Sequence, residues 1–318
     1  MPDPKPVLIM LGGATPRVRE RLAERFEVIA WNGGNPPQGT DTAVAASVYA
    51  GAKCRAEQID AMPRLKVIGN YGVGYDSVDA RHAASKGIIV THTPDVLNDE
   101  VANTAVLLLL ATDRKIVEYD RYVRDGRWES EGDAPLTRGV RGRQVGIIGL
   151  GRIGSTIAEK LETAFGARIA YHSRSKKDVP YRYYDDLVAM ARDCDALIAI
   201  TPGGPDTSKL VSREVMAALG PEGTLVNVAR GSVVDESAMI ELLRDGKLGA
   251  AGLDVFEAEP SVPQALRDMP HVVLTPHVGS ATQETRDAMS DLVVDNIVAV
   301  VDGNRPPTPV PECRSLVG

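Results

Sequence analysis

The chain has 318 residues, a formal net charge of −7 and 43% apolar residues, which suits a soluble protein of two domains with aliphatic cores. The negative charge argues against a nucleic-acid partner or an anionic membrane surface, and the apolar runs are too short to span a bilayer. Cys54, Cys194 and Cys313 are few and far apart, so we expect no disulfide framework, no metal site and a reducing, cytoplasmic location.

The first hundred residues alternate between strand and helix patterns. Strands are predicted at 6–11, 27–31, 43–49, 65–68 and 88–91, with helices at 16–26, near 56–61 and near 79–86. This alternation is typical of a parallel sheet with helical crossovers. An acidic helix start at 98–100 and an apolar pattern from Val101 to Val123 predict one long helix that leaves this unit, with a domain crossing near residue 99.

A second alternation follows a polar loop at 132–142. Strands are predicted at 144–148, 168–171, 196–200, 223–228, 250–255 and 272–274, then a helix at 282–301 and an extended tail at 306–311. The last helix is long enough to return to the first unit. We therefore predict an α/β protein with two Rossmann-like or flavodoxin-like domains on parallel sheets, a discontinuous one of residues 1–98 plus 284–318 and one of residues 99–283.

A glycine run, Gly149-Leu150-Gly151-Arg152-Ile153-Gly154, lies between the strand at 144–148 and an amphipathic helix pattern. Gly149 permits the tight turn, Gly151 lets backbone approach an anion, and Gly154 lets the helix pack on the strand. The helix N-terminus offers free N–H groups to a pyrophosphate. A purely structural glycine turn is the alternative. The context favours a dinucleotide site that includes Arg152 and Ile153.

The segment Ser173-Arg174-Ser175 follows the next predicted strand, where an acid would hydrogen-bond the ribose 2′-hydroxyl of NAD. Serine does not repel a phosphate at this point, and a guanidinium fork beside hydroxyl groups suits a 2′-phosphate. Lys176 and Lys177 add positive charge. The alternative is a solvated polar turn. The sequence predicts NADP as cofactor, with NADPH preferred over NADH.

Three more motifs follow in order, at 227–231 (NVARG), 254–260 (DVFEAEP) and 275–280 (TPHVGS). With the glycine run, they make the chain resemble the D-2-hydroxyacid dehydrogenase family over nearly its whole length. Within it, the chain most resembles the NADPH-dependent glyoxylate, hydroxypyruvate and hydroxyphenylpyruvate reductases. The resemblance implies a homodimeric enzyme that reduces small 2-keto acids to D-2-hydroxy acids in a cleft between a substrate domain, the discontinuous one, and a dinucleotide domain.

The resemblance also implies that Arg230, Glu259 and His277 converge as catalytic residues, and their chemistry fits. Arg230 is a permanent planar cation that can bind a carboxylate and polarise a keto oxygen. Histidine is the usual general acid at neutral pH, so His277 can protonate a developing alkoxide, while Glu259 can orient the imidazole. The alternatives are a surface ion pair for Arg230, a turn cap for Glu259 and a backbone-bonded loop histidine for His277.

The other site residues are carried over from the resemblance. Val73 and Gly74, in the loop 70–75, are expected to bind the substrate carboxylate through their N–H groups opposite Arg230, with a tight turn as the alternative. Tyr49, Tyr71 and Tyr75 either surround the substrate side chain or pack within their own domain. Further cofactor contacts are expected from Thr104, Thr201, Pro202, Thr207, Val228, Ala229, Asp254 and Gly279.

Two other functions stay open at this point. One is a nucleotide-sensing corepressor or binding protein on the same fold, because some regulatory relatives keep the three catalytic residues. The other is D-3-phosphoglycerate dehydrogenase, for which NAD is the expected cofactor. Trp128 lies beyond the long predicted helix, and whether it reaches a partner subunit is left open.

Overall fold

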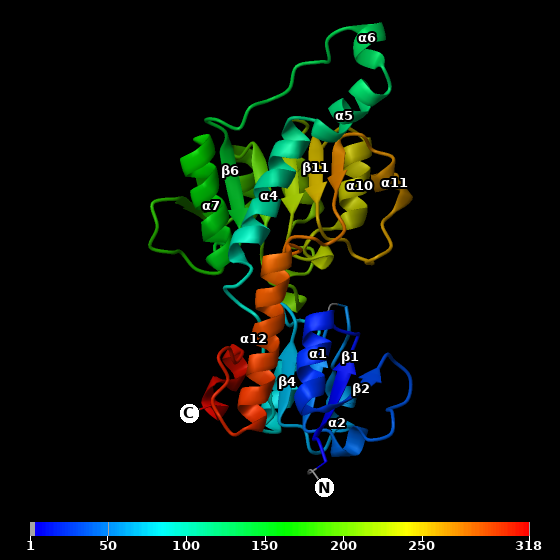
Figure 1. The fold of residues 1–318 in the computed structure, drawn as a ribbon. Helices are drawn as coiled ribbons and strands as arrows, with labels where there is room; N and C mark the ends of the chain where they lie inside the picture. The colour runs from blue at the N-terminus through cyan, green and yellow to red at the C-terminus, as the bar shows by residue number, and fades with distance from the viewer. Residues whose placement is uncertain (1–3, 50, 318) are drawn as a thin grey trace. The chain divides into compact units, whose positions relative to one another are not determined.

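The computed structural model describes residues 4–49 and 51–317 and divides into two compact units, Met1–Leu97 with Ala281–Gly318, and Asn98–Ser280 (Figure 1). The outermost residues of the first predicted domain, 1–3 and 318, lie outside the described residues. Each unit carries one parallel sheet flanked by helices, which confirms the predicted α/β fold class. The cleft expected between the domains stays a prediction.

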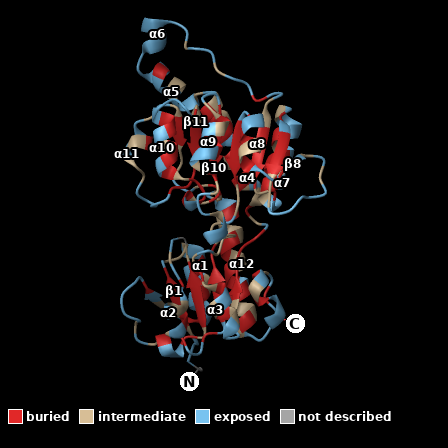
Figure 2. Ribbon diagram, turned by 180° about the vertical axis from the view of Figure 1, so that it is seen from behind, coloured by how far each residue is buried: buried red, intermediate tan, exposed pale blue. Residues whose placement is uncertain are grey.

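The first unit is built on five parallel strands in the order β2-β1-β3-β4-β5, the flavodoxin-like order. Its strands read as continuous apolar runs because helices cover both faces of such a sheet (Figure 2). The strands are β1 (Val7–Leu11), β2 (Glu27–Trp31), β3 (Ala45–Val48), β4 (Val67–Asn70) and β5 (Ile89–Thr91). The helices are α1 (Pro16–Arg25), α2 (Ala56–Asp60), α3 (Ala80–Ser85) and α12 (Gln283–Val301), with 3-10 turns η1 (Thr40–Thr42) and η4 (Pro311–Leu316).

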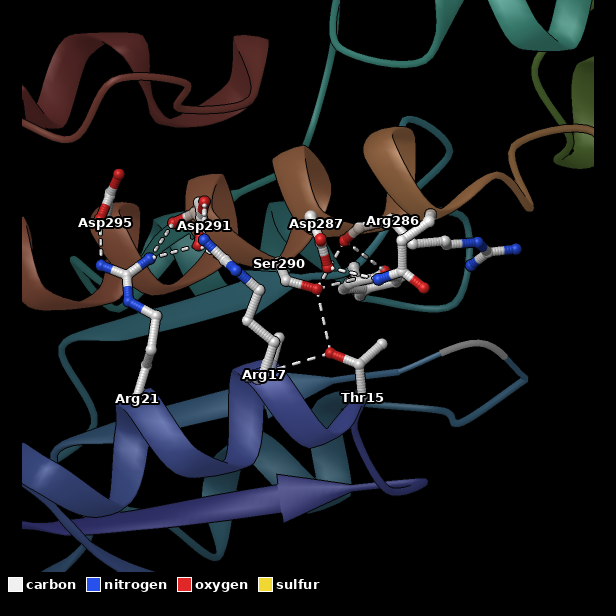
Figure 3. A network of polar contacts seen from close by, with 11 residues as sticks. Thr15, Arg17, Arg21, Arg286, Asp287, Ser290, Asp291 and Asp295 are labelled. Atoms are coloured by element: carbon white, nitrogen blue, oxygen red, sulfur yellow. Dashed lines mark hydrogen bonds and ion pairs between the residues drawn. The ribbon is translucent and has the colours of Figure 1, made fainter.

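Helix α12 joins the end of the chain to its beginning. It packs on β3, β4 and β5 and lies against α1, which starts after the N-cap residue Thr15. Arg17 and Arg21 of α1 both bind the Asp291 carboxylate of α12, at 2.7 and 2.9 Å, and Arg21 also binds Asp295 at 2.9 Å (Figure 3). The hydrogen bond from Arg17 is the largest cause of a lowered pKa at Asp291. These partly exposed pairs set the alignment of the two helices more than they add stability.

The second unit has seven parallel strands in the order β12-β11-β10-β9-β6-β7-β8. Counted from β6, this is the dinucleotide-binding order with one strand added. The strands are β6 (Gln144–Ile148), β7 (Arg168–His172), β8 (Arg182–Tyr184), β9 (Ala196–Ala199), β10 (Thr224–Asn227), β11 (Ala250–Leu253) and β12 (Val272–Leu274). Because all strands are parallel, their carboxyl ends meet at one edge.

Helices of the second unit pack in two groups. Helices α4 (Asn98–Asp113) and α7 (Arg152–Phe165) contact each other, and α8 (Leu187–Asp193), α9 (Arg213–Leu219) and α10 (Glu236–Arg244) form a row. Shorter elements are α5 (Ile116–Arg124), α6 (Arg127–Glu131), α11 (Gln264–Arg267), η2 (Pro205–Thr207) and η3 (Gly231–Val233). The packed faces of the α8–α10 row are buried against the sheet.

The single helix predicted from Val101 to Val123 is wrong. The chain forms α4 and α5 instead, separated at Lys115, whose φ of 49° lies in the left-handed region that ends a helix. Asp113 explains the position of the break: its buried carboxylate accepts hydrogen bonds from Arg143 and from the Thr224 hydroxyl, which ties the end of α4 to the sheet. Helices α5 and α6 then project from the body of this unit (Figure 1).

The predicted helix at 282–301 is confirmed as α12, and the tail pairs with β5 through a bridge between Thr91 and Pro309 before η4. In the described part of the chain no helix has the length and apolarity needed to cross a membrane. The same residues contain no group of His, Cys, Asp or Glu side chains placed to hold a metal ion.

Candidate active site

Three catalytic candidates follow three neighbouring strands. Arg230 comes after β10, Glu259 after β11 and His277 after β12. The pairing of Asn227 with Leu253, and of Leu253 with Leu274, puts the last residues of these strands level. The parallel sheet therefore delivers all three segments to the same edge.

The side chains of His277 and Glu259 form a hydrogen-bonded pair. Nδ1 of His277 lies 2.7 Å from Glu259 Oε2, and Glu259 Oε1 accepts the Phe256 N–H at 3.0 Å. Burial opposes ionisation of Glu259, but the hydrogen bonds from His277 and Phe256, with the charges of His277 and Arg230, outweigh it and lower the pKa of this carboxyl. Since Nδ1–H donates to the carboxylate, Nε2 of the 45% exposed imidazole is available to a substrate.

Asp254 holds the backbone around His277. His277 has a φ of 53°, and its N–H donates to the Asp254 carbonyl at 2.8 Å. The Asp254 carboxylate, 2% exposed, accepts from the Thr275 hydroxyl at 2.7 Å and from the N–H groups of Val278 and Gly279 at 2.8 Å each. Both carboxylate oxygens thus bind the loop that carries His277. A contact from Asp254 to the nicotinamide stays a prediction.

Arg230 is positioned by the turn that follows β10. Asn227, 1% exposed, donates to the Arg230 carbonyl at 3.0 Å and accepts from the Ala229 N–H at 3.1 Å, while Arg230 Nη1 donates to the Ala229 carbonyl at 2.8 Å. A Cβ on Gly231 would come within 2.0 Å of the Phe256 carbonyl. Glycine thus lets this turn lie directly on the Glu259 segment, which brings the two charges close.

Sequence reasoning missed two side chains that shape this part of the site. One is Asn227, whose signal was a polar residue at the end of a buried strand. The other is Glu236, the first residue of α10, whose 9% exposed carboxylate accepts the Glu257 N–H at 3.1 Å. Burial raises the pKa of Glu236 despite that bond. Glu236 and Glu257 are 21 positions apart, and no pattern in the sequence predicts a contact between them.

The glycine run forms the expected turn between β6 and α7. Gly149 has a φ of 103°, and a Cβ there would lie 2.8 Å from the Ile200 carbonyl oxygen. A Cβ on Gly154 would lie 2.2 Å from the Gly149 oxygen, so this glycine sets how closely α7 packs on the strand. A Cβ on Gly151 would meet no described atom within 4 Å, so the backbone there is open. Arg152 and Ile153 begin α7, whose first turn has no acid.

The segment after β7 carries positive charge without acidic partners. The Ser173 hydroxyl donates to the Ser175 carbonyl at 2.7 Å, which tightens the turn. Arg174, Lys176 and Lys177 are exposed, and none of them forms an ion pair with a residue between 4 and 317 that the structure describes. The guanidinium and ammonium groups are therefore available to an anion such as a 2′-phosphate.

The other predicted cofactor residues lie along the same edge, with different bonding. Thr201, after β9, has a buried hydroxyl for which the described residues provide no partner. Thr207 donates to the Pro202 carbonyl at 2.7 Å, and Thr104 donates to the Gly279 carbonyl at 3.3 Å. Val228 and Ala229 are buried after β10. The open backbone at Gly151, the unpaired Thr201 hydroxyl and the Arg174 segment fit a phosphorylated dinucleotide.

The loop predicted to bind the substrate carboxylate belongs to the first unit. Asn70, at the end of β4, donates to the carbonyls of Gly72 and Gly74 at 3.1 and 3.0 Å, and His92 Nδ1 lies 2.9 Å from the Val73 carbonyl. Neither the Val73 nor the Gly74 N–H donates to any other described group. A loop whose carbonyls are bonded and whose amides are free is suited to an anion. Asn70 and His92 were not predicted as supports of this loop.

Two other histidines are bonded within their own units. His82 Nε2 lies 2.8 Å from Asp60, and His172 Nδ1 lies 3.0 Å from the Tyr184 carbonyl. Burial lowers the pKa of His271. His277 is bonded to Glu259, a carboxylate on which the charge of Arg230 also acts.

Comparisons with known proteins agree with this geometry. A family model described as "D-isomer specific 2-hydroxyacid dehydrogenase, NAD binding domain" matches residues 106–279. Hydroxyphenylpyruvate reductase of Plectranthus scutellarioides is 49% identical over 93% of this chain and 90% of its own length. Glyoxylate/hydroxypyruvate reductase A of Arabidopsis thaliana is 48% identical over 84% and 85%. NADPH-dependent glyoxylate/hydroxypyruvate reductase of Sinorhizobium meliloti, solved with NADP and malonate, superposes with a TM-score of 0.92 at 46% identity, covering 97% and 98% of the two chains.

Proposed function

The chain belongs to the D-isomer specific 2-hydroxyacid dehydrogenase family, and from this premise we propose that it reduces small 2-keto acids, such as glyoxylate and hydroxypyruvate, with NADPH. The resemblance found in the sequence is thereby confirmed, and the protein is an oxidoreductase. The single observation that carries the proposal is the His277–Glu259 pair at 2.7 Å, close enough to Arg230 for that charge to act on Glu259.

Arg230, His277 and Glu259 of the second unit have separate roles in the reaction. The bound dinucleotide supplies the hydride. Arg230 binds the keto acid and polarises its keto oxygen, so that charge developing there meets a fixed cation. His277 delivers a proton from Nε2 to this oxygen, and the ionised Glu259 stabilises the imidazolium through Nδ1. In the direction of oxidation, neutral His277 takes the proton back.

We assign the remaining roles by unit. The first unit is the substrate domain, in which the free N–H groups of Val73 and Gly74 bind the C1 carboxylate. The second unit is the dinucleotide domain, in which the first turn of α7 binds the pyrophosphate and Arg174 with Ser173 and Ser175 binds the 2′-phosphate. The bonding of Asn70 and His92 to the loop carbonyls supports the first assignment.

The cofactor assignment predicts a measurable preference. In steady-state assays with glyoxylate and hydroxypyruvate, kcat/KM should be about tenfold or more higher with NADPH than with NADH, because Arg174 adds a charge-assisted hydrogen bond to the phosphate. Arg174→Ala should remove most of this difference. Arg192→Ala, which deletes an exposed arginine of α8, is the matched control and should leave it unchanged. Equal kcat/KM for both cofactors in the wild-type protein would contradict the assignment.

The same assay separates this function from its competitors. Phenylpyruvate, pyruvate and 3-phosphohydroxypyruvate complete the substrate panel. Turnover of 3-phosphohydroxypyruvate with NADH alone would favour D-3-phosphoglycerate dehydrogenase. Dinucleotide binding with no turnover of any keto acid would favour the nucleotide-sensing corepressor.

We also propose that the protein is a homodimer. Apolar side chains are exposed along α4, α5 and α6, among them Leu107 at 61% and Trp128 at 59%, and a shallow hollow beside Leu107 is lined by Leu110 and Phe165. Exposed apolar surface that continues from α4 onto the projecting α5 and α6 is typical of a self-association face. Sedimentation equilibrium should give twice the chain mass, and Leu107→Glu should shift it toward the monomer. A wild-type monomer at micromolar concentration would contradict the proposal.

The three cysteines support a reducing location. Cys54, Cys194 and Cys313 are all free and buried, and burial raises the pKa of the Cys54 and Cys194 thiols to about 12. We accordingly assign the protein to the cytoplasm.

A further inference from the structure

Two aromatic rings stand at the carboxyl edge of the first sheet. Tyr49 follows β3 and Tyr71 follows β4, and their ring centroids are 4.9 Å apart. The Tyr71 N–H donates to the Val48 carbonyl at 2.8 Å. This bond fixes the backbone of Tyr71 beside the end of β3. Tyr71 comes two residues before Val73, whose amide is assigned to the substrate carboxylate. This aromatic pair therefore borders the loop proposed to bind substrate.

The Tyr71 ring is fixed from the side of α12. Its hydroxyl donates to the Arg286 carbonyl at 3.1 Å and lies 3.5 Å from the hydroxyl of Ser290. Ser290 is 1% exposed; it also donates to the Arg286 carbonyl, at 2.6 Å, and its oxygen lies 2.9 Å from the Thr15 hydroxyl (Figure 3). Hydrogen bonds thus link the Tyr71 ring to α12 and, through Ser290, to the N-cap residue Thr15. They leave Tyr71 little freedom to move.

Arg286 is bonded differently from Arg17 and Arg21, the arginines of α1 that bind α12. Its guanidinium lies 5.8 Å from the centroid of the Tyr71 ring and is half-buried. Arg17 and Arg21 bind the acids of α12, whereas the Arg286 side chain extends away from Asp291 and no bond reaches its guanidinium in Figure 3. The guanidinium group itself forms no hydrogen bond or ion pair with a residue of the described ranges 4–49 and 51–317. A partly desolvated guanidinium on an aromatic face, with its donors free, is suited to an acceptor from outside the protein.

We propose that Arg286, held over the Tyr71 ring, determines specificity by binding an oxygen-bearing substituent on carbon 3 of the keto acid. The inference rests on the proposed function and deepens it. The amides of Val73 and Gly74 serve the C1 carboxylate, and Arg230 with His277 serves the keto group. The proposed function assigns no group to the other end of the keto acid, and Arg286 supplies a cation beside Tyr71 of the same loop. The preferred substrates are accordingly 2-keto acids with a hydroxyl or carboxylate beyond carbon 2.

The test compares three substrates in the wild-type protein and Arg286→Met. Hydroxypyruvate carries a hydroxyl on carbon 3, pyruvate carries only hydrogens there, and glyoxylate has no carbon 3. We expect kcat/KM for hydroxypyruvate to fall by about ten- to a hundredfold, as for loss of a hydrogen bond to a charged group, with the other two substrates within about twofold. Arg286→Lys keeps the charge without the planar fork and should recover part of the loss.

Arg305→Met is the matched control, because it deletes an exposed arginine of the same unit. It should leave all three values unchanged. An equal fall for the three substrates in Arg286→Met would show a general structural role and overturn the proposal, and so would no change for any of them.

A binding measurement keeps this inference separate from the proposed function. If the wild-type protein reduced no keto acid, the proposed function would fail, and Arg286 would then be judged by calorimetric titration of the NADP-saturated protein with malonate. One carboxylate of malonate would occupy the Val73–Gly74 loop and the other would reach Arg286. At least about tenfold weaker binding in Arg286→Met than in Arg305→Met supports the subsite. Equal binding, or none to the wild-type protein, overturns it.

Discussion

Replacing His277 with alanine is expected to lower kcat for glyoxylate and hydroxypyruvate by about 10²- to 10⁴-fold, the usual contribution of a general acid. The variant loses the proton carried on Nε2, while the turn of the glycine run and the Arg174 segment are unchanged. NADPH should therefore still bind. Steady-state kinetics measures the first effect, and titration of the quenching of protein fluorescence by NADPH measures the second.

His82→Ala is the matched control for this experiment. His82 is also bonded to a carboxylate, Asp60, at 2.8 Å, but on the surface of the first unit, so kcat should stay at the wild-type value. A near-normal kcat in His277→Ala would refute the role of His277 as proton donor.

The lowered pKa of Glu259 bears on the pH range in which the pair persists. The folded-state pKa lies below the ordinary value of a glutamate, mainly because bonds from His277 and Phe256 overcome the effect of burial. The contribution of the ionised carboxylate to stability is therefore complete above that ordinary value and is lost as pH falls through the lowered one. At neutral pH Glu259 is a carboxylate and acts as an acceptor only.

Arg230→Lys is expected to lower kcat/KM for every keto acid by about 10²- to 10³-fold, comparable to the removal of one donor from a site that stabilises a developing oxyanion. Lysine keeps the charge but loses the planar fork that binds a carboxylate and a keto oxygen together. It also loses the Nη1 bond to the Ala229 carbonyl that fixes the direction of the side chain. Steady-state kinetics over the full substrate range separates kcat from KM.

The same substitution at an exposed arginine of this unit, Arg192→Lys, should change neither parameter. A rise of KM in Arg230→Lys with kcat unchanged would mean that Arg230 binds ground state and transition state equally, against the role assigned to it. Wild-type kcat/KM would exclude Arg230 from the site altogether.

Much of the fold could be predicted because its strands are buried on both faces and read as short apolar runs. The break between α4 and α5 could not, since the apolar period continues from Val106 through Val117 across Lys115. What ends α4 is the attachment of Asp113 to Arg143 and Thr224, residues 30 and 111 positions further along the chain. Local patterns carry no information on contacts at that distance.

The candidate site, too, has one part that the sequence predicts and another that it does not. The motifs place Arg230, Glu259 and His277 correctly at the ends of adjacent strands, because parallel pairing turns chain order into spatial order. The supporting bonds were not predictable, since Asn70 and Glu236 act on backbone groups whose position only the folded loops define. A polar side chain that ends a buried strand, as Asn70 and Asn227 do, is the one signal that would have singled out two of these supports.

The closure of the first unit by α12 has a consequence for synthesis on the ribosome. Arg17 and Asp291 are 274 residues apart, yet they join the helices that complete this unit. The second unit is one continuous segment, so it can fold as soon as it has emerged. The first unit has to wait, with α1 and its apolar face uncovered, until the last helix leaves the exit tunnel. The aligned charges of α1 and α12 are therefore well placed to guide two distant segments together at the final step of folding.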